Sequence, residues 1–367
     1  MNVPFLSFTG QNHLIEAKIR AAFERVFQNN WYILGKEVSD FERAYANYNQ
    51  VQNCIGVANG LDALHIALKS LEVGEGDEVI TPSNTFIATW LAISQTGATI
   101  IPVEPDPGTF NLDVTRLEAV ITPKTKVIMP VHLYGQACQM DAIMQIASKH
   151  DLYVVEDNAQ AQGCTYNGKP TGSFGNINAT SFYPTKNLGA YGDAGALTTN
   201  DAGLARKAKL IRNYGSEKKY YNDVIGVNSR LDELQAAFLL VKLEYLNGWL
   251  NERKQIAAAY TDQLAGIPGL ILPVTAPGAD HVYHLYVIRT ARRDELEQHL
   301  TGKGIGTAIH YPVAPHLQKA YGHLGYKKGD FPIAEELAET CLSLPLNPGM
   351  TEGEIKYVCE IIRLFHG

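Results

Sequence analysis

The chain lacks the features that mark secreted, membrane-spanning and nucleic-acid-binding proteins. Its 367 residues include five cysteines, an odd number without a Cys-x-x-Cys pair, which favours a reduced, cytoplasmic compartment. No window approaches the roughly 20 apolar residues that a membrane-spanning helix needs, and the N-terminus has no signal-peptide pattern. The formal net charge of −7 leaves no basic field, so we expect neither nucleic acid nor membrane as a partner.

Hydrophobic residues make up 46% of the chain, enough for a large core and a second, smaller one. Residues 12–29 repeat apolar side chains at three- and four-residue steps, which predicts an amphipathic helix. From residue 51, short strand-like runs alternate with helical runs, which predicts a mostly parallel sheet covered on both faces. The predicted strands are 53–59, 78–83, 99–104, 127–133, 152–157, 179–185 and 195–200, and the helices between them are 60–71, 85–97 and 140–151.

After residue 229 the pattern changes. A long helical run covers 229–264 and contains Gly248, a candidate kink or domain boundary. Strands are then predicted at 281–290 and 306–312, and helices at 292–304, 332–344 and 353–365. This mixture predicts a smaller α+β domain. We therefore expect a large domain at 1–247 and a small one at 248–367, with the N-terminal helix able to pack on the small domain.

Lys186 stands in an unusual place for a lysine. It follows a predicted strand in SFYPTKNLGAYGDAGALTTN, among aromatic residues and glycines that allow close approach of the backbone. A solvent-facing lysine is the alternative, but Ser181 and the glycines suit a crowded, phosphate-lined pocket. Burial lowers the pKa of a lysine and makes its neutral amine available for an imine with an aldehyde.

Two other motifs are expected at the same edge of the sheet, because ligands of such sheets bind beyond the carboxyl ends of the strands. A predicted helix begins at Asn59-Gly60, and the N–H groups of its first turn could bind an anion. An ordinary helix start without a ligand would have the same sequence pattern. Asp157 ends a strand and could be a general base, the partner of a protonated ring nitrogen, or a helix cap. No cluster with metal-ligand spacing surrounds it, so no metal is expected.

An imine-forming lysine, an acid and a phosphate-binding turn together indicate pyridoxal phosphate. At this point the motifs VVEDNAQAQG, SFYPTKNLGAYGDAGALTTN, IRNYGSEKKYYN and GVNSRLDELQAA resemble the DegT/DnrJ/StrS sugar-nucleotide aminotransferases, which are fold-type-I pyridoxal-phosphate enzymes. WYILGKEVSDFE and GIGTAIHYPVAPH extend the resemblance over nearly the whole chain. It implies an aspartate-aminotransferase-like α/β fold, with a mostly parallel central sheet, helices on both faces and a smaller C-terminal α+β domain.

The resemblance also implies roles for residues around the cofactor. Lys186 would form the imine, Asp157 would pair with the pyridine nitrogen, and Gln160 would lie beside the hydroxyl oxygen of the ring. The ring of Phe86 would stack over the pyridine. The cofactor phosphate would be bound by the amides of Gly60 and Leu61 and by the hydroxyl of Ser181.

Four further positions follow from the same resemblance. Asn228 would reach the cofactor phosphate of a neighbouring subunit, which implies a homodimer with shared active sites. Tyr183, Lys219 and His310 would lie on the substrate side. Structural alternatives exist for several of them. Phe86 would serve as core, Asn228 as a helix cap, His310 as a satisfied structural histidine, and Lys219 as a solvated surface charge.

The motifs ANGLDALHIAL, PSNTFIATWLA, VHLYGQ and KYYN are most similar to the branch that aminates dTDP-linked 3-keto-6-deoxyhexoses. The expected activity is therefore transfer of an amino group from L-glutamate to such a sugar in the cytoplasm. A 4-keto sugar aminotransferase and a pyridoxal-phosphate-dependent sugar dehydratase are the alternatives, together with a cofactor-binding protein without activity. A dehydratase relative has histidine at the lysine position, so Lys186 favours transamination.

Overall fold

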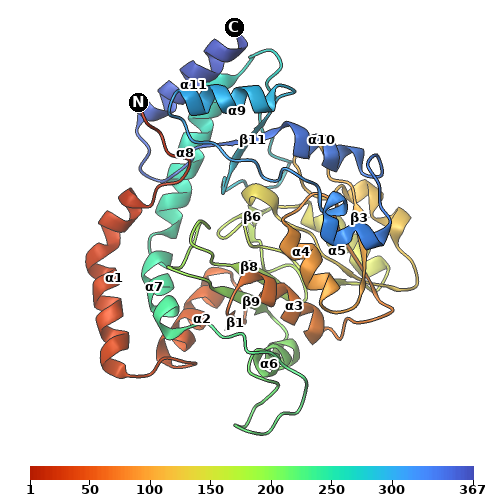
Figure 1. The fold of residues 1–367 in the computed structure, drawn as a ribbon. Helices are drawn as coiled ribbons and strands as arrows, with labels where there is room; N and C mark the ends of the chain where they lie inside the picture. The colour runs from red at the N-terminus through yellow and green to blue at the C-terminus, as the bar shows by residue number, and fades with distance from the viewer.

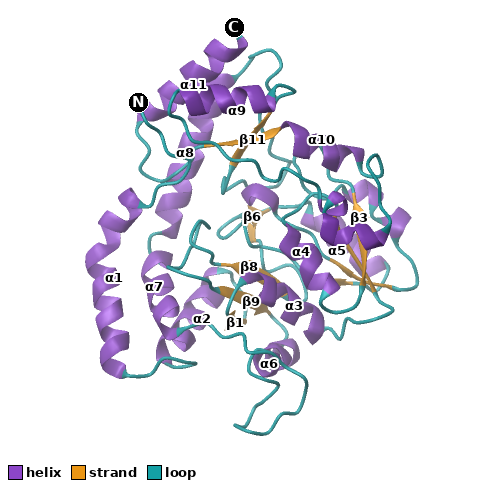
Figure 2. Cartoon of the chain, in the orientation of Figure 1, coloured by secondary structure: helices purple, strands orange, loops and turns teal.

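The computed structural model describes all 367 residues, and its centre is a seven-stranded sheet between two layers of helices (Figures 1 and 2). The strands are β1 (Asn53–Val57), β2 (Glu78–Pro82), β3 (Thr99–Val103), β4 (Thr125–Ile128), β5 (Tyr153–Val154), β6 (Thr165–Tyr166), β7 (Lys169–Pro170), β8 (Asn178–Ser181), β9 (Gly195–Thr199), β10 (Tyr286–Arg289) and β11 (Cys341–Leu344). The helices are α1 (Thr9–Asn29), α2 (Lys36–Tyr48), α3 (Gly60–Ser70), α4 (Ile87–Ser94), α5 (Met140–Lys149), α6 (Ala202–Ile211), α7 (Glu233–Leu243), α8 (Leu246–Leu264), α9 (Arg293–Gly302), α10 (Pro332–Thr340) and α11 (Glu352–His366).

The central sheet is mostly parallel, as the sequence predicts. β3, β2, β4 and β5 pair in parallel in that order. Just beyond β5, Asp157 continues the parallel pairing to Ala179 in β8. β9 then lies antiparallel between β8 and β1. The order β3-β2-β4-β5-β8-β9-β1 brings the carboxyl ends of the parallel strands to one edge, where a ligand site is expected.

Both faces of this sheet are buried, which explains why its strands read as apolar runs rather than as alternating patterns. On one face, α2, α5 and α7 supply a core that includes Phe41, Tyr45 and Phe182. On the other face, α3, α4 and α6 supply a second core around Trp90 and Leu197. The loops that follow the strands are therefore held by two packed layers.

The C-terminal part has a core of its own. β10 and β11 pair antiparallel, and α8, α9 and α11 pack beside them through residues such as Tyr260, Leu296 and Ile362. Val3 joins this core by a bridge to Ile305, whereas α1 packs on α7 and the first turn of α8, and both chain ends lie near α9 and α11 (Figure 1). The domain boundary at 247/248 stays a prediction.

Three details differ from the predicted elements. The helical run from 229 is broken at residues 244–245, and Gly248 lies inside α8 facing open space. The predicted helix 332–344 ends early because residues 341–344 pair with β10, so tertiary pairing overrides the helical pattern. Residues 306–312 form no strand beyond a single bridge.

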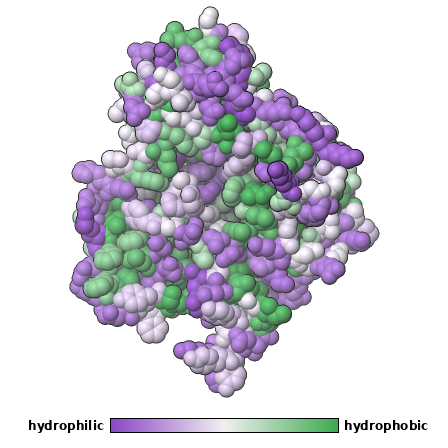
Figure 3. All heavy atoms as spheres, viewed as in Figure 1, coloured by the Kyte–Doolittle hydropathy of each residue, from purple (hydrophilic) through white to green (hydrophobic).

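No helix of the structure is long and apolar enough to cross a membrane. Hydrophilic and hydrophobic residues are interspersed on the face shown in Figure 3, without a continuous hydrophobic belt.

Candidate active site

A cavity of about 470 Å³ lies where the carboxyl ends of β1, β2, β5 and β8 meet. Nine of the eleven residues predicted for the site line it. They are Gly60, Leu61, Phe86, Asp157, Gln160, Ser181, Tyr183, Lys186 and His310. Because they come from five separate segments of the chain, only the fold brings them together.

Lys186 lies on the loop that leaves β8. Its backbone N–H donates to the carbonyl of Tyr183 at 2.8 Å, which closes a turn and directs the side chain to the cavity. Burial lowers the pKa of Lys186 to about 8, and the negative charge of Asp157 acts in the opposite direction. A substantial fraction of the amine is therefore neutral near pH 8, as an amine that attacks an aldehyde must be.

Asp157 is only 6% exposed and is held from two sides. Thr89 Oγ1 donates to Oδ2 at 2.9 Å, and the N–H of Ala159 donates to Oδ1 at 3.1 Å. Burial raises the pKa of Asp157, while these bonds and the nearby Lys186 partly oppose the rise. A cationic N–H donor in the cavity would therefore stabilise the ionised carboxylate, which suits a protonated pyridine nitrogen.

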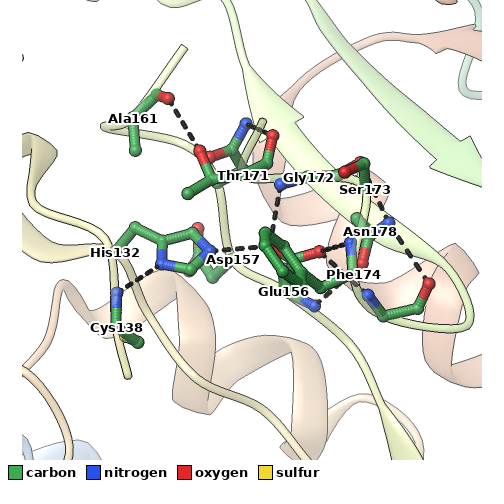
Figure 4. Close-up of polar contacts among 12 residues, drawn as sticks. His132, Cys138, Glu156, Asp157, Ala161, Thr171, Gly172, Ser173, Phe174 and Asn178 are labelled. Carbon is green, nitrogen blue, oxygen red and sulfur yellow. Dashed lines mark hydrogen bonds and ion pairs between the residues drawn. The ribbon is translucent and has the colours of Figure 1, made fainter. Parts of the chain in front are cut away.

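The residue before Asp157 is structural. Glu156 is fully buried and accepts from His132 Nε2 and the N–H of Gly172 through Oε2, both at 2.8 Å (Figure 4). Its Oε1 accepts from the N–H groups of Phe174 and Gly175 at 2.6 and 2.9 Å. Burial opposes ionisation of Glu156, but these donors hold its pKa below the usual value. This network anchors the strand end that carries Asp157.

The predicted phosphate-binding turn has the required geometry. The side chain of Asn59 accepts from the N–H of Asp62 at 2.8 Å and so caps α3. A Cβ on Gly60 would lie 2.6 Å from the Cβ of Ser181, so only glycine allows the helix start to approach the serine this closely. The free N–H groups of the first turn and the serine hydroxyl thus face one anion-sized space.

Some of the residues that close the cavity near Asp157 were predicted from the sequence, and others were not. Gln160 Oε1 accepts from the N–H of Tyr134 at 2.6 Å, and its Nε2 donates to the hydroxyl of Tyr311 at 3.0 Å. The rings of Tyr311 and Phe86 lie 5.3 Å apart. His310 Nδ1 lies 2.9 Å from Ser343 Oγ, and burial lowers the pKa of His310 to about 4. It is therefore neutral at physiological pH.

Two predicted residues do not reach this cavity. Asn228 is exposed and lines a neighbouring pocket with Asp193, a residue that also lines the Lys186 cavity. Lys219 is exposed on the long loop after α6, with its amine 5.1 Å from the ring of Tyr220 (Figure 1). Within one chain, neither side chain contributes to the cavity.

Thr89 and Tyr311, which hold Asp157 and Gln160, were not predicted from the sequence. Thr89 looks like an ordinary residue of an apolar helix, so no sequence signal marked it. Tyr311 follows the predicted His310 directly, and that position was the available signal.

Pyridoxal phosphate fits this donor set, since an amine of lowered pKa, a buried acid and a glycine-lined helix start face one space. The sequence model of the DegT/DnrJ/EryC1/StrS aminotransferase family matches residues 13–363. The dTDP-3-amino-3,6-dideoxy-alpha-D-galactopyranose transaminase of Aneurinibacillus thermoaerophilus is 49% identical over 363 residues, 99% of each chain.

Two crystal structures share the fold. DesV of S. venezuelae in complex with a ketimine intermediate is 46% identical, with a TM-score of 0.98 over 100% of this chain and 98% of the other. NtdA from Bacillus subtilis with bound cofactor PMP is 33% identical, with a TM-score of 0.91 over 100% and 85%. The predicted fold, activity class and cofactor are confirmed, and the chain belongs to the DegT/DnrJ/EryC1/StrS family of pyridoxal-phosphate-dependent aminotransferases.

Proposed function

We propose that this aminotransferase moves an amino group from L-glutamate to the keto group of a nucleotide-linked 3-keto-6-deoxyhexose. The observation that carries the proposal is the position of Lys186, a lysine of lowered pKa that shares a cavity with Asp157. The cavity at the helix start would take the cofactor, and the space toward Tyr183 and His310 would take the substrates.

When bound, the cofactor supplies an electron sink for the carbanion formed at the donor's α-carbon. Lys186 Nζ would hold the cofactor through its aldehyde carbon and, once displaced by the donor's amine, would serve as the general base and acid for the α-proton. Asp157 would keep the proton on the ring nitrogen. The N–H groups of Gly60 and Leu61 and the hydroxyl of Ser181 would bind the phosphate, and Phe86 would stack on the ring.

The choice of a dTDP-linked 3-keto sugar rests on the similarity to the transaminase of A. thermoaerophilus, whose name states a dTDP-3-amino product. A 4-keto sugar is the alternative substrate. The test incubates the enzyme with glutamate and either 3-keto or 4-keto dTDP-6-deoxyhexose and assigns the product by NMR. We expect amination at carbon 3 with stoichiometric 2-oxoglutarate. Amination of only the 4-keto sugar would overturn the substrate, and product without 2-oxoglutarate would indicate a dehydratase.

Two residues predicted for the site lie outside the cavity of their own chain, which supports the further proposal of a homodimer with shared active sites. Asn228 and Lys219 are exposed outside the cavity, and Asn228 lines a pocket that adjoins it at Asp193. We propose that both side chains act in the partner's site. Five buried cysteines without a disulfide support the proposal that the enzyme works in the cytoplasm.

Subunit mixing tests the shared site. Lys186→Ala and Asn228→Ala are each expected to lower activity strongly, because each removes a group from every site. A mixed dimer of the two variants has one intact site of two, and about half of randomly assembled dimers are mixed. Refolding the variants together should therefore restore about a quarter of wild-type activity. No recovery in mixed dimers that have been shown to form would contradict shared sites.

A further inference from the structure

A second cavity, of about 240 Å³, opens beside the first and contains a buried arginine. The two cavities adjoin, because both are lined by Tyr183, Thr185, His284 and His310. Arg253, from the middle of α8, lines only the smaller one and is 5% exposed. An arginine is almost never buried without a specific partner.

The hydrogen bonds of Arg253 use only one of the three nitrogens of its guanidinium. Nη1 donates to the carbonyls of Tyr283, His284 and Leu346 at 3.2, 3.3 and 3.1 Å. Neither Nε nor Nη2 donates to any group of the chain, and no carboxylate forms an ion pair with the side chain. Carbonyl oxygens do not neutralise a charge, so an anion that entered this cavity would gain a charge-assisted contact with Arg253.

A second polar group nearby also has no partner. Nδ1 of His284 is buried without a hydrogen bond, and the residue is 8% exposed. Burial lowers the pKa of His284 well below its usual value, with the charges of Lys186 and Arg253 acting in the same direction. The neutral ring can donate one hydrogen bond from Nδ1. His284 lines both cavities and is close enough to Lys186 and Arg253 for both charges to affect its pKa.

We propose that Arg253 binds a carboxylate group of the amino donor through Nε and Nη2, with the neutral ring of His284 in the wall of the same subsite. Resting on the proposed function, this assigns the smaller cavity as the donor subsite. The planar fork of arginine matches a carboxylate bidentately. A cavity of this size has room for a five-carbon amino acid but not for a nucleotide sugar. Because donor and acceptor react in separate half-reactions, the donor subsite can be tested alone.

The test measures each half-reaction of the holoenzyme by the absorbance of the bound cofactor. In Arg253→Lys the concentration of glutamate needed for half-saturation should rise about 10- to 100-fold, because one charge-assisted bidentate contact is lost. The half-reaction of the aminated enzyme with the keto sugar should stay within about 2-fold of wild type.

Arg293→Lys is the matched control. Arg293 is buried in the same part of the protein, and its Nη1 also donates to two carbonyls, of Ala338 and Cys341 at 3.1 and 3.2 Å. It does not line either cavity, so both half-reactions of this variant should be unchanged. Equal loss of both half-reactions in Arg253→Lys, or no loss in the glutamate half-reaction, would overturn the proposal.

A donor series on the wild-type enzyme gives a result that does not depend on folding of a variant. Glutamate, glutamine and glutamic acid α-amide differ in which carboxylate is present. If one amide reacts at least about 10-fold less efficiently than glutamate, the carboxylate it lacks is the bound one. Amides that both react like glutamate would exclude a carboxylate subsite while leaving the aminotransferase function intact. Absence of any reaction with glutamate would instead contradict the proposed function.

Discussion

The substitution Glu156→Gln tests whether the buried network behind Asp157 holds the site together. Each carboxylate oxygen of Glu156 accepts two hydrogen bonds, Oε2 from His132 and Gly172 and Oε1 from Phe174 and Gly175. A glutamine has one oxygen, so its NH₂ group must face two buried donors. Each donor left unpaired costs about 1–3 kcal/mol, which gives a loss of about 2–6 kcal/mol in the free energy of unfolding.

The assay is urea unfolding of the cofactor-free protein, followed by titration with pyridoxal phosphate. Glu335→Gln is the control, because Glu335 also pairs with a buried histidine. Its Oε1 alone accepts these hydrogen bonds, from His316 Nε2 at 3.0 Å and from the N–H of Gly329 at 2.7 Å. A glutamine can keep its oxygen in that place, so a loss of about 1 kcal/mol or less is expected, with unchanged cofactor affinity. The reasoning is refuted if both variants lose the same stability, or if Glu156→Gln unfolds like wild type.

The remaining predictions concern acid sensitivity and the cofactor site. The lowered pKa of Glu156 means that its contribution to stability is present above its ordinary value of 4.5 and is lost as the pH falls through the folded-state pKa, so Glu156→Gln should show a shallower acid limb in pH-dependent unfolding. Gly60→Ala should weaken cofactor binding about 10-fold or more, because its Cβ would meet Ser181; equal affinity in a titration would contradict the close approach. Thr89→Val removes a donor that lowers the pKa of Asp157, so the loss of cofactor affinity on acidification should begin at higher pH; an unchanged profile would show that the bond does not matter.

Much of the central sheet could be predicted because its strands and helices alternate with clear periodicity. Lys186, Asp157 and Gly60 could be predicted because each follows a strand, and parallel strands end at a common edge. The sequence-based predictions fail where contacts with residues distant in the sequence determine the secondary structure. Residues 341–344 continue a helical pattern, yet they form a strand because β10 lies beside them.

Other site residues carry no local signal at all. Thr89 reaches Asp157 from a helix 68 positions earlier in the chain, and Tyr311 reaches Gln160 from 151 positions later. Arg253 lies in the charged run NERKQ, which reads as the solvated face of a helix, but packing of α8 buries it. Such contacts depend on tertiary packing, which no short stretch of sequence encodes.

The central claim is that the amine of Lys186 carries the cofactor, and covalent trapping tests it most directly. Purified protein loaded with pyridoxal phosphate is reduced with borohydride, digested and analysed by mass spectrometry. We expect a pyridoxyl group on the peptide that contains Lys186, at about one per chain, and its absence when glutamate is added before reduction. An adduct on another lysine, or no adduct on a protein that has bound the cofactor, would contradict it.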